Sequence, residues 1–192
     1  MTGPLDTPPA ASAFAEEQQR YQVRFDVGLD GARRIGASAH LLVWCDGIAT
    51  EPLPLDVLPP HLEIIDARCG AAALIAQRLL ALQAARGERT VVAVVAAGSP
   101  ARAPNSIPVE DHLRAGAVID ALGAVGIDAT SPEAAVAAAG YQGLRAAVAH
   151  LLSASVGGRA LAAAEGAEAL SAARARWESA ELLVPREFDL SA

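Results

Sequence analysis

The sequence predicts a three-layer α/β fold, in which a mostly parallel sheet of about five strands is flanked by helices. Three observations lead to this prediction. Short β-branched runs alternate with helical stretches along the chain. The run Thr90–Ala97 (TVVAVVAA) contains no polar residue between its ends, which is typical of a strand covered on both faces. The segment from Leu62 to Thr90 has the strand–helix–strand order that pairs strands in parallel with a right-handed crossover.

The bulk composition indicates a globular chain and excludes some partners. Of 192 residues, 53% are hydrophobic and 19% are charged, so we expect one α/β domain over residues 21–192. Residues 1–20 lack a period and are predicted to be a flexible tail. The net charge of −7 argues against nucleic acid as a partner. Without a signal peptide or a long apolar run, we expect a cytoplasmic protein that does not bind membranes.

Three strands are predicted in the first half of the chain. They are Tyr21–Asp26, His40–Cys45 and Leu62–Ala67. In the first of them Tyr21, Val23 and Phe25 alternate with Gln22, Arg24 and Asp26, which predicts one polar face. A short helical stretch is expected at 32–37. The segment 48–60 is rich in proline and is predicted to be a loop.

Helices dominate the prediction after residue 70. The first, Gly70–Arg86, ends at Gly87, and the second begins with Pro108 at its first helical position and reaches Leu122. A third helix starts after Ser131 as N-cap, with Pro132 at the first position. We expect Gly140 and Gly143 to divide this helix.

The C-terminal part is predicted to hold shorter elements. Ser155–Arg159 (SVGGR) is expected to be a glycine-rich turn between helical pieces. Two more helical pieces follow, and Glu181–Pro185 is predicted as a last strand at an edge of the sheet.

The stretch from Thr90 to Leu122 is where we expect a ligand. Gly98 ends the buried strand, and a helix begins shortly afterwards with Glu110 and Asp111 in its first turn. In an open α/β sheet, ligands bind beyond the carboxyl ends of the strands, near helix N-termini. Asp46 follows another predicted strand and would lie at the same edge if the two strands are neighbours.

These three acids are candidate ligands for Mg²⁺, which commonly takes one or two protein carboxylates and completes its shell with water and phosphate oxygens. A structural interpretation is also open. Acidic residues in a first helical turn stabilise the helix dipole, and an aspartate before glycine favours a turn. A third possibility is metal-free capture of an anion by the Gly98 turn and the following helix N-terminus.

Several short motifs resemble the 2-phosphosulfolactate phosphatase family, and they lie in the same order along the chain. The central one is the acidic helix start, with Val109, Glu110, Asp111, Leu113, Ala115, Gly116 and Ala117 at the family's positions. Further similarity lies in VRFDVGLDGA (Arg24, Asp26, Gly28, Gly31), in HLLVWCDGIAT (Asp46), in SPEAAVAA, and in SVGGRAL (Ser155, Gly158, Arg159, Leu161).

The resemblance implies a Mg²⁺-dependent phosphatase that hydrolyses a small acidic phosphate monoester. The implied ligand is a small phosphorylated or sulfonated acid. It implies that Asp46, Glu110 and Asp111 are the catalytic and metal-binding residues. The implied substrate-binding residues are Arg24, Arg68, Gly98, Ser99 and Arg159. A homo-oligomer is a further expectation.

An alternative function follows from what the chain lacks. Family members carry a longer segment with an Asn-Gly turn between the second strand and the helix near Ala71, where this chain has only the loop Ile48–His61. After the central strand, Gly98 is followed by Ser99 and Pro100 in place of the family's arginine-containing sequence. The alternative is therefore an inactive family member that serves as a ligand-binding or interaction module.

Overall fold

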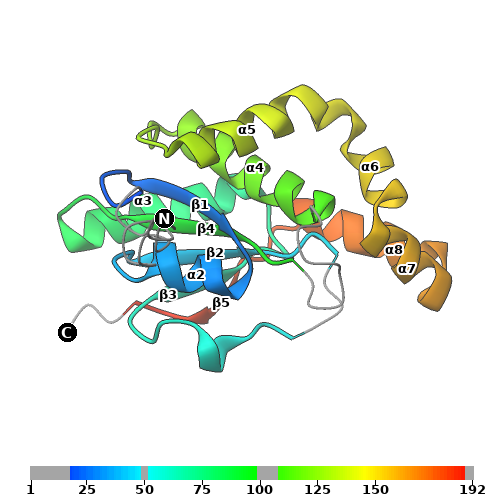
Figure 1. Ribbon diagram of the computed structural model, residues 1–192, viewed down its shortest axis with the longest axis horizontal. Helices are drawn as coiled ribbons and strands as arrows, with labels where there is room; N and C mark the ends of the chain where they lie inside the picture. The colour runs from blue at the N-terminus through cyan, green and yellow to red at the C-terminus, as the bar shows by residue number, and fades with distance from the viewer. Residues whose placement is uncertain (1–17, 49–51, 99–107, 189–192) are drawn as a thin grey trace, which may run out of the picture.

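The computed structural model of the protein describes residues 18–48, 52–98 and 108–188. Its centre is a five-stranded sheet (Figure 1). Its strands are β1 (Val23–Val27), β2 (Leu41–Cys45), β3 (Glu63–Asp66), β4 (Val92–Ala96) and β5 (Leu183–Arg186). Their order across the sheet is β1-β4-β2-β3-β5. The first four strands run parallel, and β5 pairs antiparallel with β3 at the edge. The predicted α/β class and the mostly parallel sheet are confirmed.

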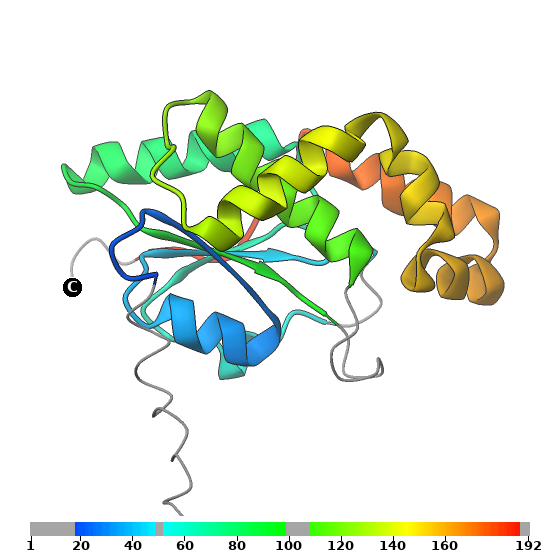
Figure 2. The same ribbon diagram turned by 45° about the horizontal axis from the view of Figure 1, so that its top comes forward.

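Helices cover both faces of this sheet (Figures 1 and 2). One face packs against α3 (Ala72–Arg86), α4 (Val109–Ala124) and α5 (Pro132–Leu144), and the other packs against α2 (Gly28–Gly36) and residues 53–58. Alternate side chains of β2 enter the two cores: Leu41, Val43 and Cys45 enter the first, and Leu42 and Trp44 the second. The apolar runs therefore form strands buried on both faces, and three layers are confirmed.

Three further helices extend past the carboxyl ends of the parallel strands (Figure 1). They are α6 (Val148–Ala154), α7 (Val156–Glu165) and α8 (Ala167–Ala175). Their apolar residues form a third cluster around Trp177, which also includes Ile48 after β2 and Leu113 of α4. Single 3₁₀ turns lie at Leu55–Val57, Arg145–Ala147 and Arg176–Glu178.

Several helix ends follow the local sequence signals. Gly87 ends α3 in the left-handed conformation, with φ of 69°, and its N–H donates to Gln83 O. Ser131 caps α5 as predicted, because its hydroxyl accepts a hydrogen bond from the N–H of Ala134 at 3.2 Å. Pro108 is the N-cap of α4, and the helix begins one residue later than predicted.

Two predictions about glycines are wrong. Helix α5 continues through Gly140 and Gly143 and ends at Leu144. The cost of about 1 kcal/mol for a glycine in a helix is too small to break this one. The expected turn Ser155–Arg159 is the start of α7, because the Ser155 hydroxyl accepts from Gly158 N–H and caps that helix.

The order of the strands and the polar face of β1 also differ from the prediction. Strands β3 and β4 are parallel, but β2 lies between them, so they do not pair directly. The polar face of β1 is buried: Arg24 is 3% exposed. Its guanidinium donates to the carbonyl oxygens of Gln19, Tyr21 and Ile35 and to the Ser38 hydroxyl, which compensates for its burial.

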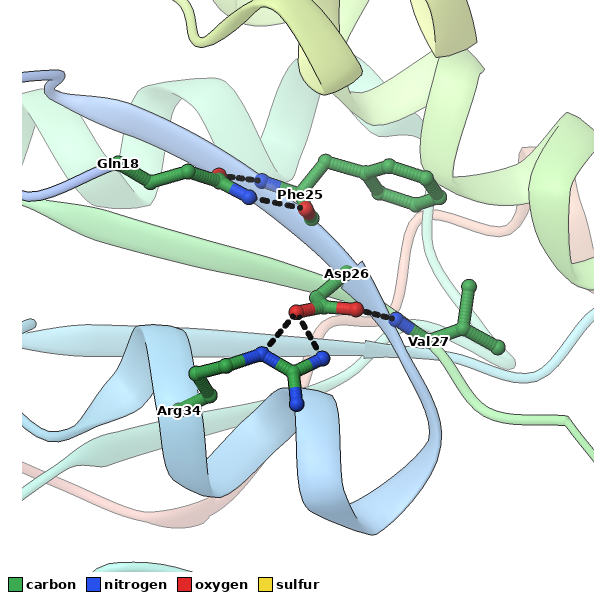
Figure 3. A network of polar contacts seen from close by, with 5 residues as sticks. All are labelled: Gln18, Phe25, Asp26, Val27 and Arg34. Carbon is green, nitrogen blue, oxygen red and sulfur yellow. Dashed lines mark hydrogen bonds and ion pairs between the residues drawn. The ribbon is translucent and has the colours of Figure 1, made fainter. Parts of the chain in front are cut away.

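The outer edge of β1 is closed by a side chain. The amide of Gln18 accepts the N–H of Phe25 and donates to its carbonyl, both at 3.0 Å (Figure 3). Further along the same strand, the Asp26 carboxylate accepts the N–H of Val27 at 2.8 Å and pairs with Arg34 at 2.7 Å (Figure 3). These contacts satisfy edge groups that would otherwise be open to pairing with another strand. Residues 18–20 of the predicted tail thus belong to the fold, and 1–17 lie outside the described residues.

Replacing Gln18 by alanine is expected to lower the free energy of unfolding by about 1–2 kcal/mol, because two backbone groups of Phe25 lose their partners. Urea unfolding of both forms measures this loss. The matched control is Gln19→Ala, because Gln19 is exposed and the side-chain contacts with Phe25 are made by Gln18. Equal stability of the two variants would show that the Gln18 amide contributes nothing to the edge.

No single helix in the described ranges has both the length and the hydropathy of a membrane span. One bent pair, Pro132–Ala154 with Val156–Glu165, passes on length and composition, with an angle of 48° between its parts.

Candidate functional site

The carboxyl ends of the parallel strands stop in register and bring distant segments together. Val27 and Cys45 both lie opposite Ala96 of β4, and Trp44 lies opposite Asp66 of β3. The residues that follow these ends include Asp46 after β2, Arg68 after β3 and Gly98 after β4. The first turn of α4, with Glu110 and Asp111, closes the same edge.

Asp111 connects two of these strand ends to α4. Its Oδ1 accepts the N–H of Gly47 at 2.8 Å, across 64 residues of sequence, and its Oδ2 accepts the N–H of Gly98 at 2.9 Å. Gly47 can approach so closely because it has no side chain; a Cβ there would lie 2.5 Å from the carbonyl oxygen of Glu110. Asp111 is 4% exposed. Its carboxylate therefore acts as a clamp between β2, β4 and α4.

Glu110 faces the N-terminus of α7. The N–H of Gly157, in the first turn of that helix, donates to Glu110 Oε1 at 3.2 Å. A carboxylate is stabilised at this position because the helix N-terminus carries a partial positive charge. Glu110 is 4% exposed, so its side chain is buried although the contact with Gly157 is only partly so.

Asp46 lies among other charged groups at the ends of β2 and β3. Arg68 forms an ion pair with Asp66 at 2.6 Å, and its positive charge also acts on Asp46. Burial raises the pKa of Asp46 to about 6, against the effect of Arg68 and with additional repulsion from Asp66 and Glu110. Burial likewise raises the pKa of Asp111 to about 7, with a further contribution from the charge of Asp46. Acids with raised pKa values at a sheet edge are typical of functional sites.

These shifts predict that the metal-free protein loses stability as the pH rises. Both carboxyls keep their protons to a higher pH in the folded state than in the unfolded chain, where the pKa is 3.8. The folded state therefore binds more protons from about pH 4 to 7, and stability falls through that window. We expect a loss of about 2–4 kcal/mol between pH 5 and pH 8, measured by urea unfolding in a chelator.

Asp111→Asn should flatten this pH dependence, because it removes one of the two titrating groups. The control is Asp128→Asn, which changes an exposed carboxyl and should leave the dependence as in the natural protein. Stability that rises from pH 5 to pH 8 would contradict the assignment.

The predicted substrate-binding residues have four different outcomes. Arg68 and Gly98 lie with the acids at the carboxyl edge, although the N–H of Gly98 is already bound to Asp111. Arg24 does not join them, because its guanidinium is bound to backbone carbonyls on the α2 side of β1. Arg159 is exposed on α7, four residues after the N-cap Ser155. Ser99 lies outside the described residues.

Sequence reasoning missed a buried arginine that supports this edge. Arg114 is 1% exposed and donates to the carbonyl oxygens of Ala67 and Gly70, the former at 2.6 Å. Its guanidinium lies over the ring of Trp177, at 5.2 Å from the centroid, and Trp177 Nε1 donates to Gly47 O at 2.9 Å. An arginine directly before the small and apolar run Ala115–Ile119 is the available signal, but its spacing does not reveal whether it is buried.

The acidic side chains at this edge offer carboxylate oxygens, which are suitable ligands for a hard cation such as Mg²⁺. Carboxylate oxygens are what Mg²⁺ prefers, and one or two protein carboxylates are enough. Asp46 and Glu110 are the better candidates, because both oxygens of Asp111 accept backbone N–H groups. Within the described residues, no three acidic, histidine or cysteine side chains are grouped as a complete metal site.

Comparison with known proteins adds no family to this description. Neither models of protein families nor curated protein sequences match the chain.

Proposed function

We propose that the carboxyl edge of the sheet is the active site of a Mg²⁺-dependent phosphatase that hydrolyses a small acidic phosphate monoester. The proposal rests on the placement of these acids at the sheet edge where α/β proteins bind ligands: Asp46 directly follows β2, and Asp111 at the start of α4 accepts the N–H of the next residue, Gly47. The motifs that resemble the 2-phosphosulfolactate phosphatase family support the same assignment.

Each residue has a role in this proposal. Asp46 and Glu110 would hold the cation, and a bound Mg²⁺ would polarise the phosphoryl oxygens. Arg68, positioned by its ion pair with Asp66, would contact the phosphate and offset its negative charge. Asp111 would keep the ends of β2 and β4 at a fixed separation from α4 through its bonds to Gly47 and Gly98.

A bound Mg²⁺ would also help to activate the attacking water, because water on a metal ion loses its proton at a lower pH than bulk water. The substrate's own acidic group would be neutralised by an arginine, for which exposed Arg159 on α7 is a candidate.

The test is a turnover assay with p-nitrophenyl phosphate and with small phosphate esters that carry a carboxylate or a sulfonate. The proposal expects phosphate release with Mg²⁺ and none after chelation. Addition of Mg²⁺ should also restore the activity of the chelated protein. The absence of turnover from the folded protein, with any ester and with Mg²⁺, would reject the enzymatic function.

The second candidate is a binding module without catalysis. It is favoured by the engagement of both Asp111 oxygens with Gly47 and Gly98, which makes that acid structural. This candidate expects a folded protein that binds Mg²⁺ or a phosphorylated acid in calorimetry but releases no phosphate.

A further inference from the structure

A groove with no part in the proposed reaction lies between α4, α5 and β1. Its volume is about 590 Å³, and its walls are mainly apolar. The apolar lining residues include Phe25, Val109, Leu113, Val136, Tyr141 and Leu144. Val136 is 73% exposed and Leu144 is 44% exposed, so large apolar side chains face the solvent here. The size and lining are those of a site for a small organic molecule.

The groove and the acidic cluster use different sides of α4. Val109, His112 and Leu113 line the groove, whereas Glu110 and Asp111 contact residues at the strand ends and α7. A helix turns by about 100° per residue, which separates these two sets within a single turn. A molecule in the groove therefore does not need to touch the carboxylates of the proposed active site.

His112 gives the groove a defined hydrogen-bonding character. Its Nδ1 lies 3.1 Å from the carbonyl oxygen of Pro108. A carbonyl only accepts hydrogen bonds, so Nδ1 carries the proton, and in the neutral ring Nε2 is left as an acceptor. The ring is held in place by an edge contact with Phe25, with 5.4 Å between the centroids.

The acidic residue of the groove is also a hydrogen-bond acceptor. Glu133, in the first turn of α5, is exposed and is a hydrogen-bond acceptor when ionised. Among the described residues that line the groove there is no arginine. An anionic group on a ligand would therefore be repelled by Glu133 and would meet another acceptor at His112. A hydrogen-bond donor on a ligand could bind His112 or Glu133.

We propose that this groove binds an apolar molecule, with an alkyl chain or a ring, that carries one hydrogen-bond donor as an alcohol or a primary amine. The apolar body would lie along α5 against Val136 and Leu144, and the donor would reach His112 or Glu133. This site is independent of the proposed phosphatase activity.

Two glycines of α5 provide a matched pair of variants. A Cβ at Gly140 or at Gly143 would meet nothing within 4 Å, so the fold accepts a side chain at either position. Gly140 lines the groove, and Gly143 is not among its lining residues. Gly140→Phe should fill the groove, and Gly143→Phe should leave it open. Both substitutions replace glycine in the same helix, so their effects on helix stability are comparable.

The experiment measures binding of decanol, decylammonium and decanoate by ligand-observed NMR, with decanol below its solubility limit and the two ionic probes below their critical micelle concentrations. We expect the natural protein to bind decanol and decylammonium at least about tenfold more tightly than decanoate. Gly140→Phe should weaken binding of the first two by about tenfold or more, and Gly143→Phe should not. In His112→Phe, which keeps the contact with Phe25, the advantage of decanol over decanoate should shrink.

Three results would overturn the proposal. The first is equal binding by the two glycine variants. The second is binding of decanoate at least as tight as that of decanol. The third, from light scattering, is a dimer of the natural protein that Gly140→Phe dissociates and Gly143→Phe leaves intact, because a second copy of the chain would then cover the groove.

Discussion

Replacing Asp46 by asparagine is expected to reduce turnover by at least about a hundredfold and to leave the protein as stable as before, or slightly more stable, at pH 8. Asparagine has nearly the same shape, but it lacks the negative charge that would hold a cation. The natural carboxylate is penalised by burial, since its pKa is raised to about 6, so removing its charge relieves the folded state. Steady-state kinetics with Mg²⁺ and urea unfolding measure the two effects.

Asp111→Asn is the comparison that separates catalysis from structure. An asparagine keeps one acceptor but turns an NH₂ group towards Gly47 or Gly98, whose N–H groups are donors. We expect the free energy of unfolding at pH 8 to fall by about 1–3 kcal/mol. This figure already includes the stability gained by removing a buried negative charge. Full activity of Asp46→Asn would remove Asp46 from the mechanism, and unchanged stability of Asp111→Asn would contradict its role as a clamp.

Most elements of this fold could be predicted because they have local signals, although the start of α7 was mistaken for a turn. The β-branched run that gives β4 is apolar on both faces, and Ser131 with Pro132 marks the start of α5. The order of the strands has no such signal. That β2 separates β3 from β4 depends on pairing between residues distant in the sequence, such as Cys45 with Ala96.

The candidate site shows the same division. Asp46 and the pair Glu110–Asp111 could be placed at strand and helix ends, and parallel strands bring such ends to one edge. The partners of each side chain could not be predicted. The spacing of Asp111 does not reveal that two glycine N–H groups occupy its oxygens, and the alternation around Arg24 suggested solvent where α2 supplies carbonyl partners.

Arg114 is the residue whose loss should cost the most stability. Its guanidinium donates to the carbonyl oxygens of Ala67, Cys69 and Gly70 in the β3–α3 loop and reaches that of Trp177 at 3.5 Å. Arg114→Met keeps much of the volume but leaves these buried acceptors without a donor. We expect the free energy of unfolding to fall by about 3–5 kcal/mol, as for other buried charged networks that lose one member. Urea unfolding measures the loss, and Arg145→Met is the control because Arg145 is exposed.

A milder substitution tests whether the same arginine also positions the site. Arg114→Lys keeps the positive charge but cannot reach several carbonyls at once, so the β3–α3 loop should loosen while the fold remains. The N–H of Arg68 is bonded to Asp66 at 3.2 Å within this loop, and its faster hydrogen exchange would report that loosening. In the proposed reaction, Arg68 would then contact the phosphate less well, so KM should rise more than kcat falls. If Arg114→Lys lowers the stability but the hydrogen exchange of the Arg68 N–H is unchanged, Arg114 stabilises the fold without positioning Arg68.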